Sequence, residues 1–253
     1  MTFQFQTTEL NAHYDAVYDA TERRWREICA LDKANHIVAL LGERASQVGS
    51  VLEVGCGTGD VVARLSKLGL GKTFVGVDVI DPGMNNDHVR DQDNLSFVRQ
   101  TGPHLPFEDG SFDLVFASHV LEHVEDERAF LKEIARVSRR YMYLEVPCEL
   151  HARTRYSDLQ ASLDIGHINA YTPESFSLTL ATSGLDVLDL RCFDHSVAVH
   201  AFHTSTLKGY LKRALRSTLL SVSENLAPKV FTYHCGALCT PPKRDVEGTI
   251  RHD

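Results

Sequence analysis

Three glycines at alternate positions leave a bare stretch of backbone directly after a short apolar run. Residues 51–60 read Val-Leu-Glu-Val-Gly-Cys-Gly-Thr-Gly-Asp. Because Gly55, Gly57 and Gly59 carry no β-carbon, the chain can turn sharply and a ligand can contact its backbone and the first amides of the next helix. Cys56 is then a small residue within the turn. The pattern predicts a strand, a tight turn and a helix that bind a nucleotide-like molecule, with a plain strand-to-helix connection as the alternative.

Two carboxylates accompany this turn. Glu53 lies inside the apolar run, where a carboxylate is costly to bury unless a cation or a hydrogen-bond donor meets it. Asp78 is near the end of a second apolar run, 72–79, and lies 19 residues beyond Gly59. A carboxylate at the end of the second strand can accept hydrogen bonds from both hydroxyl groups of a ribose. The glycine spacing differs from the Gly-x-Gly-x-x-Gly of dinucleotide-binding proteins, which disfavours a nicotinamide-dependent enzyme.

Short apolar runs alternate with segments of helical periodicity along the chain. The expected strands are 51–54, 72–79, 95–99, 113–117, 141–146, 185–191 and 230–239. The expected helices are 9–30, 34–41, one from residue 60, one from residue 118, 125–137, 172–182 and 206–223. Strands that alternate with helices predict an α/β protein with a parallel sheet, in which ligands bind at the carboxyl ends of the strands.

A longer motif follows the third expected strand. Residues 105–124 read LPFEDGSFDLVFASHVLEHV. Together with the glycine turn and Asp78, this stretch resembles the type-11 branch of the class I S-adenosylmethionine-dependent methyltransferases. The resemblance implies S-adenosyl-L-methionine as the cofactor and a Rossmann-like methyltransferase fold, with a doubly wound, seven-stranded, mostly parallel sheet whose last strand is antiparallel. In this family the residue at the position of Glu53 lies near the methionine end of the cofactor.

The resemblance and the expected strand ends place one set of residues around the cofactor. These are Glu53, Gly55, Cys56, Gly57, Asp78, Val79, Thr101, Gly102, Pro103, His104, Ser118 and His119, with Tyr14 and Tyr18 added if the N-terminal helices close over the site. One position departs from the family pattern, because relatives usually carry an aspartate where this chain has Thr101. That aspartate bonds the adenine amino group in the family. Adenine recognition here would therefore depend on the Thr101 hydroxyl, on Gln100 or on the backbone of 101–104.

Three histidines are the candidate catalytic residues. Methyl transfer from a sulfonium is an in-line displacement, in which the protein mainly aligns the reactants. A hydroxyl acceptor benefits from a general base, whereas for an amine the base is optional. Of the 13 histidines, His119, His123 and His167 fall on segments that the resemblance places at or near the site. We expect them to act as base or to position the acceptor, with a purely structural role as the alternative for each.

Two groups of residues carry metal-ligating side chains. They are His119, Glu122, His123 and His167, and His234, Cys235 and Cys239. The first group is similar to the Glu-x-x-Glu-His set, completed by a further histidine, of small-RNA 2′-O-methyltransferases and some quinone-pathway enzymes, but residues three and four apart on a helix diverge in direction. In the second group, the two cysteines lie far apart along one face of an expected strand. We therefore expect no metal at either group.

The chain is expected to consist of one domain with appendages. The expected parts are N-terminal helices with a possible lid at 1–45, a methyltransferase domain at 46–240 and a frayed tail at 241–253. Within the domain, 148–170 is expected to be an irregular loop over the substrate. Residues 193–228 are a helical insertion before the last strand, and its amphipathic helix is expected to cover one end of the sheet. A cap over the substrate, a dimer contact and an interfacial membrane helix are the alternatives for this insertion.

Composition limits the partners of the protein. The 253 residues are 43% hydrophobic and 24% charged, as in an ordinary soluble globular protein. A net charge of −8 and a pI of about 5.9 disfavour nucleic acids and anionic membranes as partners. The sequence shows neither an apolar signal core nor the ~20 apolar residues of a membrane span. We therefore expect a cytoplasmic monomer or homodimer with free thiols.

These observations predict an S-adenosylmethionine-dependent methyltransferase that acts on an oxygen or nitrogen of a small molecule by in-line displacement. One alternative is a non-catalytic protein that keeps the sheet and serves as a scaffold or partner subunit. The other is an NAD-dependent oxidoreductase, which the glycine spacing disfavours.

Overall fold

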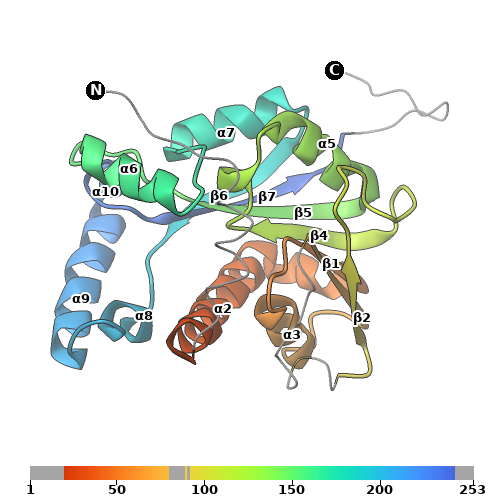
Figure 1. Ribbon diagram of the computed structural model, residues 1–253, viewed down its shortest axis with the longest axis horizontal. Coiled ribbons are helices and arrows are strands. Elements are labelled where there is room, and N and C mark those ends of the chain that lie inside the picture. Colours follow the sequence, from red (N-terminus) through yellow and green to blue (C-terminus); the bar gives the residue numbers. More distant parts are fainter. Residues whose placement is uncertain (1–19, 80–88, 90–91, 243–253) are drawn as a thin grey trace.

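The computed structural model describes residues 20–79, 89 and 92–242, and a seven-stranded sheet forms its centre (Figure 1). The strands are β1 Ser50–Val54, β2 Thr73–Asp78, β3 Leu95–Arg99, β4 Phe112–Ser118, β5 Ser138–Pro147, β6 Asp186–Phe193 and β7 His234–Thr240. Their order across the sheet is β3-β2-β1-β4-β5-β7-β6. β7 is antiparallel to both of its neighbours, and the other neighbouring pairs are parallel. The predicted α/β class, strand number and antiparallel last strand are confirmed.

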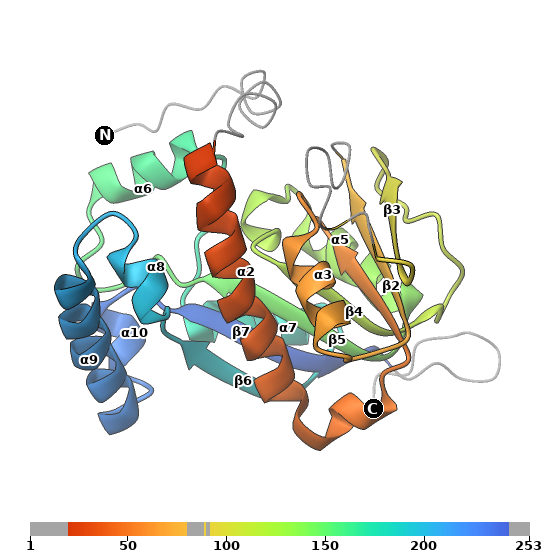
Figure 2. The same cartoon turned by 90° about the horizontal axis from the view of Figure 1, so that it is seen from below.

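Helices cover both faces of this sheet. They are α2 Ala20–Leu41, α3 Asp60–Lys67, α5 Glu127–Val137, α6 Tyr156–Asp164, α7 Pro173–Thr182, α8 Val197–Ala201, α9 Thr206–Val222 and α10 Ala227–Val230, with short 3-10 helices η1 Gly42–Gln47 and η2 Leu121–His123. α2 and α3 lie on one face, and α5 and α7 lie on the other (Figure 1). α8, α9 and α10 form a group beside one end of the sheet (Figure 2). The sheet is therefore doubly wound.

The central strands are apolar because both of their faces are covered. Every residue of β4 is buried, as expected for a strand between two parallel neighbours. One core cluster contains Leu131 of α5 and Phe176 of α7, and the other contains Ile37 of α2 and Leu65 of α3. Full burial of such a side chain contributes about 1.5–3 kcal/mol to the free energy of folding. This packing holds the helices against the sheet and so fixes the loops at the strand ends.

Helix α2 differs from the sequence prediction of two helices. The interval 20–41 contains neither glycine nor proline, so nothing interrupts the helix. Ala34, Ile37 and Leu41 have no exposed surface, which makes the second half of α2 part of the core rather than of a lid. Tyr14 and Tyr18 lie outside the described residues, and their place over the site stays a prediction.

The segment after β4 is not the helix that the sequence predicts from residue 118. His119 has a φ of 60°, the one positive value at a non-glycine residue within the described ranges. A left-handed residue cannot lie within an α-helix. The His119 amide donates to the carbonyl of Glu145 at 2.9 Å, which continues the pairing of β4 with β5. Only the three-residue 3-10 helix η2 follows.

The predicted irregular loop 148–170 contains helix α6. The amide of Arg155 donates to the carboxylate of Asp158 at 2.9 Å, which caps the start of this helix. The prediction of an irregular segment is therefore wrong for 156–164.

Helix α9 has nearly the predicted bounds but packs by a different face. Leu207, Leu211 and Leu215 are 69%, 64% and 62% exposed. Its buried residues are Gly209 and Arg216. The Arg216 guanidinium forms an ion pair with a buried carboxylate at the start of the insertion, and this contact orients the helix. The expectation that the leucines cover the sheet is wrong. Within the described ranges, no helix has both the length and the apolar character to cross a bilayer.

Candidate active site

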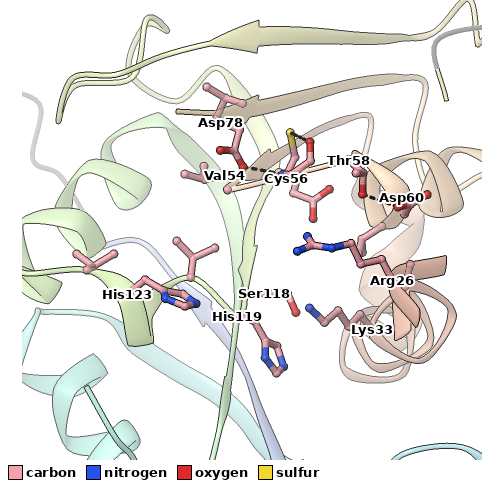
Figure 3. Close-up of a pocket in the computed structure, with 18 of the residues that line it drawn as sticks. Arg26, Lys33, Val54, Cys56, Thr58, Asp60, Asp78, Ser118, His119 and His123 are labelled. Carbon is pink, nitrogen blue, oxygen red and sulfur yellow. Dashed lines mark hydrogen bonds between the residues drawn. The ribbon is translucent and has the colours of Figure 1, made fainter. Parts of the chain in front are cut away.

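A cavity of about 880 Å³ opens at the carboxyl ends of the central strands, with α2 as one wall (Figure 3). The residues that the sequence places at the site and that line this cavity are Glu53, Gly55, Cys56, Gly57, Asp78, Val79, Gly102, Pro103, Ser118, His119, His123 and His167. The structure therefore brings most of the predicted cofactor residues and the three candidate histidines into one space.

The glycine turn closes onto the end of β2. The Gly55 amide donates to the carbonyl of Val77 at 2.8 Å, and the Gly57 amide donates to Asp78 Oδ2 at 2.6 Å. Gly55 and Gly57 have φ values of 76° and 51°, which favour glycine. A β-carbon on Gly55 would also overlap a methyl group of Val120. The turn thus needs glycine for backbone conformation and for space, and it fixes the Asp78 carboxylate at the cavity.

Glu53 is buried in β1, with 3% of its surface exposed. Its Oε2 accepts a hydrogen bond from the Val62 amide at 2.9 Å. This bond caps α3, because the N-cap residue Gly59 has no side chain that could do so. Burial raises the pKa of the Glu53 carboxyl well above its ordinary value, although the Val62 amide opposes this. A cation bound nearby would therefore favour the ionised form.

Two cationic side chains of α2 reach the site and were missed by the sequence analysis. Arg26 and Lys33 line the cavity, and Figure 3 shows Arg26 beside the glycine turn and Lys33 extended toward Ser118. A β-carbon on Gly57 would lie 3.5 Å from Arg26 Nη1. The two residues are seven positions apart, which places them on one helix face. The spacing of seven residues could have shown that the two side chains share a helix face. No local sequence pattern, however, indicates that α2 packs beside the glycine turn.

The loop after β3 brings Gln100 to the cavity rather than the side chains of Thr101 and His104. The Gln100 side-chain amide donates to the carbonyl of His104 at 2.8 Å, which closes the loop on itself. Thr101 is exposed, and 87% of the His104 side chain is exposed. Both side chains point to solvent because the closed loop turns its inner side, with Gly102 and Pro103, toward the cavity.

The other end of the cavity is formed by five residues from distant segments, which we call the histidine cluster. His119 Nε2 lies 2.8 Å from His234 Nδ1. Glu145 Oε1 lies 3.4 Å from each of these two nitrogens. His234 Nε2 lies 2.8 Å from His195 Nε2, and His36 Nδ1 lies 2.9 Å from Glu145 Oε2. All four histidines line the cavity, and Glu145 is buried behind them.

Burial sets the charges of the histidine cluster. Burial alone would raise the pKa of Glu145, but hydrogen bonds from His119, His234 and His36 outweigh it and hold the pKa well below its ordinary value. Burial lowers the pKa of His234 to about 4 and lowers that of His119 well below its ordinary value. At neutral pH the carboxylate of Glu145 therefore lies beside the neutral imidazoles of His119 and His234.

A second group at the same end contains the other two candidate histidines. His167 Nδ1 lies 3.0 Å from Glu149 Oε2, and His123 Nδ1 lies 2.9 Å from the carbonyl oxygen of Gly166. Burial raises the pKa of Glu122 to about 7 and lowers that of His123 to about 4. Burial opposes protonation of His167 as well, but the bond to Glu149 raises its pKa. His167 and Glu149 thus form an oriented acid-base pair at the cavity.

Residues 166–171 hold η2 in place. The Asn169 side-chain amide donates to the carbonyls of Leu121 and Val124, at 3.1 and 2.7 Å. The amides of Ile168 and Asn169 donate to the carbonyl of Glu122, at 2.9 and 3.0 Å. These bonds position the Leu-Glu-His segment, and with it Glu122 and His123, at the end of β4.

Sequence reasoning missed Glu145, His36 and His195 and grouped His234 with two cysteines. Because β7 is antiparallel, it starts at the edge where the parallel strands end, and His234 pairs with Pro147 at the end of β5. The first residue of this antiparallel strand therefore lies at the edge of the sheet where ligands bind. The expected antiparallel direction of β7 was the signal that could have revealed His234.

Residues 52–144 match a family described as a methyltransferase domain. Methyltransferase GfsG of Streptomyces halstedii is 30% identical over 151 residues, which cover 55% of this chain and 54% of that protein. A protein of Oryza sativa subsp. japonica named "Probable tocopherol O-methyltransferase, chloroplastic" is 26% identical over 225 residues, which cover 82% of this chain and 62% of that protein. The chain therefore spans between half and two thirds of the length of these two relatives.

A solved structure shares the fold. Geranyl diphosphate C-methyltransferase from Streptomyces coelicolor A3(2) has a TM-score of 0.60 and 13% identity, with 83% of this chain and 77% of that chain covered. The domain match, the strand order and the glycine turn with its two carboxylates agree with one another. Residues 52–144 thus match the methyltransferase domain family, and the described part of the chain has the fold of a methyltransferase.

Proposed function

We propose that the protein transfers the methyl group of S-adenosylmethionine to an oxygen or nitrogen of a small molecule. The observation that carries this proposal is the continuity of one cavity, which joins the glycine turn and Asp78 to the histidine cluster. Its volume of about 880 Å³ is large enough for the cofactor and a small acceptor together. One end suits an adenosine that carries an amino-acid group, and the other suits a nucleophile that must lose a proton.

At the cofactor end, each part of the cofactor meets a complementary group. Asp78 accepts hydrogen bonds from the ribose hydroxyls. Glu53 faces the ammonium group, which favours its ionised form, and Arg26 and Lys33 face the carboxylate. The bound cofactor supplies a methyl carbon on a positively charged sulfur. The residues of the chain supply the alignment that an in-line displacement requires.

At the acceptor end, His167 is our candidate general base. Its Nδ1 is held by Glu149, so Nε2 is oriented to take a proton. His123 lies edge-on to His167, with ring centroids 4.8 Å apart, and shapes this part of the cavity. His119 has both ring nitrogens engaged, since Nδ1 lies 3.4 Å from Glu122 Oε1 and Nε2 belongs to the histidine cluster. His119 therefore positions the acceptor rather than accepting its proton.

The relatives name two kinds of acceptor atom. The rice protein is named for O-methylation and the Streptomyces coelicolor enzyme for C-methylation. In this chain the oriented pair of His167 and Glu149 favours an acceptor that carries an acidic proton, which is an oxygen or a nitrogen.

Binding and turnover test this proposal. Calorimetry with S-adenosylhomocysteine and with NAD should show saturable binding of the first compound only. Transfer of label from methyl-labelled S-adenosylmethionine should then be measured with a panel of phenols, sugars and amines. Preferential binding of NAD would contradict the proposal, and binding without transfer to any member of the panel would favour a non-catalytic partner subunit.

A further inference from the structure

We propose that His119, Glu145 and His234 bind a divalent first-row transition-metal ion at the acceptor end of the cavity. Their atoms Nε2, Oε1 and Nδ1 form a triangle with sides of 2.8, 3.4 and 3.4 Å. Metal bonds of about 2.1 Å to nitrogen and oxygen place neighbouring ligand atoms about 3.0 Å apart at 90° and about 3.4 Å apart at 109°. The observed triangle is close to these dimensions.

The outer nitrogens of both imidazoles are already engaged. His119 Nδ1 lies 3.4 Å from Glu122 Oε1, and His234 Nε2 lies 2.8 Å from His195 Nε2. With an ion bound, we assign the ring protons to these outer nitrogens. The inner nitrogens then present lone pairs to each other and to a carboxylate oxygen. An ion between them would be bound by all three lone pairs.

The carboxylate of Glu145 is oriented by further contacts. Its Oε2 accepts a hydrogen bond from the Tyr143 hydroxyl and lies 2.9 Å from His36 Nδ1. Its Oε1 lies 3.3 Å from Ser118 Oγ, which donates to it. Partners of this kind fix the direction of metal ligands in proteins. Oε1 is consequently aimed at the two inner nitrogens.

The backbone of His119 supports a functional constraint on this position. A φ of 60° at a non-glycine residue costs about 1–3 kcal/mol and persists where the surrounding structure imposes it. Here it directs the imidazole of His119 toward His234 and Glu145, across the end of the sheet.

The ion would be reached from the cavity. His119 and His234 line it, whereas Glu145 is 1% exposed. Two imidazoles and one carboxylate leave further coordination positions open, and these face the space where the acceptor would lie. Coordination lowers the pKa of a bound hydroxyl, which would assist methylation of an oxygen. This role rests on the proposed function, but metal binding itself does not.

A second group of possible metal ligands provides a matched control for the metal-binding experiment. Ligand atoms of Glu122, His123 and His167 also lie within 4.8 Å of one another, and within the described residues these are the two groups of this kind. In this second group, however, neither oxygen of the Glu122 carboxylate has a hydrogen-bond partner that would orient it, whereas Tyr143, His36 and Ser118 orient the carboxylate of Glu145. We therefore place the ion at the first group.

Metal binding can be measured without turnover. The full chain, free of any tag, is stripped with a chelator and titrated with Co²⁺, Zn²⁺, Mn²⁺ and Mg²⁺ by calorimetry, and the Co²⁺ complex is followed by visible absorption. We expect one Co²⁺ per chain and weaker binding of Mg²⁺, which prefers oxygen ligands. Glu145→Gln and His234→Gln should weaken Co²⁺ binding by at least about 100-fold, whereas His167→Gln should retain it.

Two controls keep the outcomes distinct. His119→Asn serves as a further variant, because asparagine tolerates the left-handed backbone, and it should also lose Co²⁺. S-adenosylhomocysteine binding and thermal unfolding are measured for every variant. Absence of saturable Co²⁺ and Zn²⁺ binding by the unmodified chain overturns the metal site, as does loss in His167→Gln with retention in His234→Gln. If S-adenosylhomocysteine still binds in that case, the proposed function stands and only the metal site is wrong.

Discussion

The two ends of the cavity are built in opposite ways. At the cofactor end, the glycine turn and its carboxylates come from one continuous stretch of the chain, 53–78, and the turn presents backbone to the ligand. At the acceptor end, the histidine cluster extends from His36 to His234 along the chain, and nearly all of its contacts join side chains. The first end should therefore be sensitive to backbone changes and the second to side-chain chemistry. The predictions below test this difference.

Gly55→Ala should have the largest effect on stability. The left-handed backbone costs about 1–2 kcal/mol for a residue with a β-carbon, and the overlap with Val120 adds about 1–3 kcal/mol. We expect the free energy of unfolding, measured by urea denaturation, to fall by roughly 3 kcal/mol. Gly42→Ala is the control, since Gly42 has a φ of 53° but nothing within 4 Å of an added β-carbon. Equal losses in both variants would show that space at Gly55 is not limiting.

Asp78→Asn should weaken the cofactor end alone. The substitution keeps the size of the side chain but removes the charge that would accept the ribose hydroxyls. We expect the affinity for S-adenosylhomocysteine to fall by roughly 10- to 100-fold, or about 1.5–3 kcal/mol, in calorimetry. The affinity for Co²⁺ should stay unchanged. Asp93→Asn, an exposed carboxylate outside the cavity, should leave both affinities unchanged. Loss of Co²⁺ binding in Asp78→Asn would show that the two ends are not separate.

His119 allows backbone and side chain to be separated at the acceptor end. Both His119→Gly and His119→Ala remove the imidazole, and both should lose Co²⁺ binding. Glycine tolerates the positive φ and alanine does not, so the glycine variant should be more stable by about 1 kcal/mol. Thermal and urea unfolding of the two variants measure this difference. A more stable alanine variant would mean that the backbone relaxes when the imidazole is absent.

The pair of His167 and Glu149 should give the smallest effect, and one that depends on pH. Because the folded-state pKa of His167 is raised, its stabilisation is fully present below the ordinary histidine pKa and is lost as the pH rises through the raised value. The stability difference between the unmodified chain and Glu149→Gln should therefore be larger at about pH 5.5 than at about pH 8.5. We expect at most about 1 kcal/mol, since the pair is partly exposed. A difference that grows with pH would contradict the assignment.

The strands and the cofactor end could be predicted because their signals are local. β3 has the predicted bounds. Glu53, the glycine turn and Asp78 belong to one unit of strand, helix and strand, so their spacing along the chain predicts that they meet. The histidine cluster could not be predicted, because no spacing along the chain relates His36 on a helix to His234 on an antiparallel strand. The packing of α9 was mispredicted for a similar reason. Its amphipathic pattern suggested a buried leucine face, but an ion pair of Arg216 decides the orientation.

The direction of β7 has a consequence for how this molecule could diversify. The segment between β6 and β7 delivers His195 and ends at His234, and β4 and β5 separate that strand from β1, which carries the glycine turn. Under the proposed function, substitutions and length changes between residues 194 and 233 should therefore change which acceptor is methylated and leave cofactor binding unchanged. A library confined to this segment is the natural starting point for redirecting the protein to new acceptors.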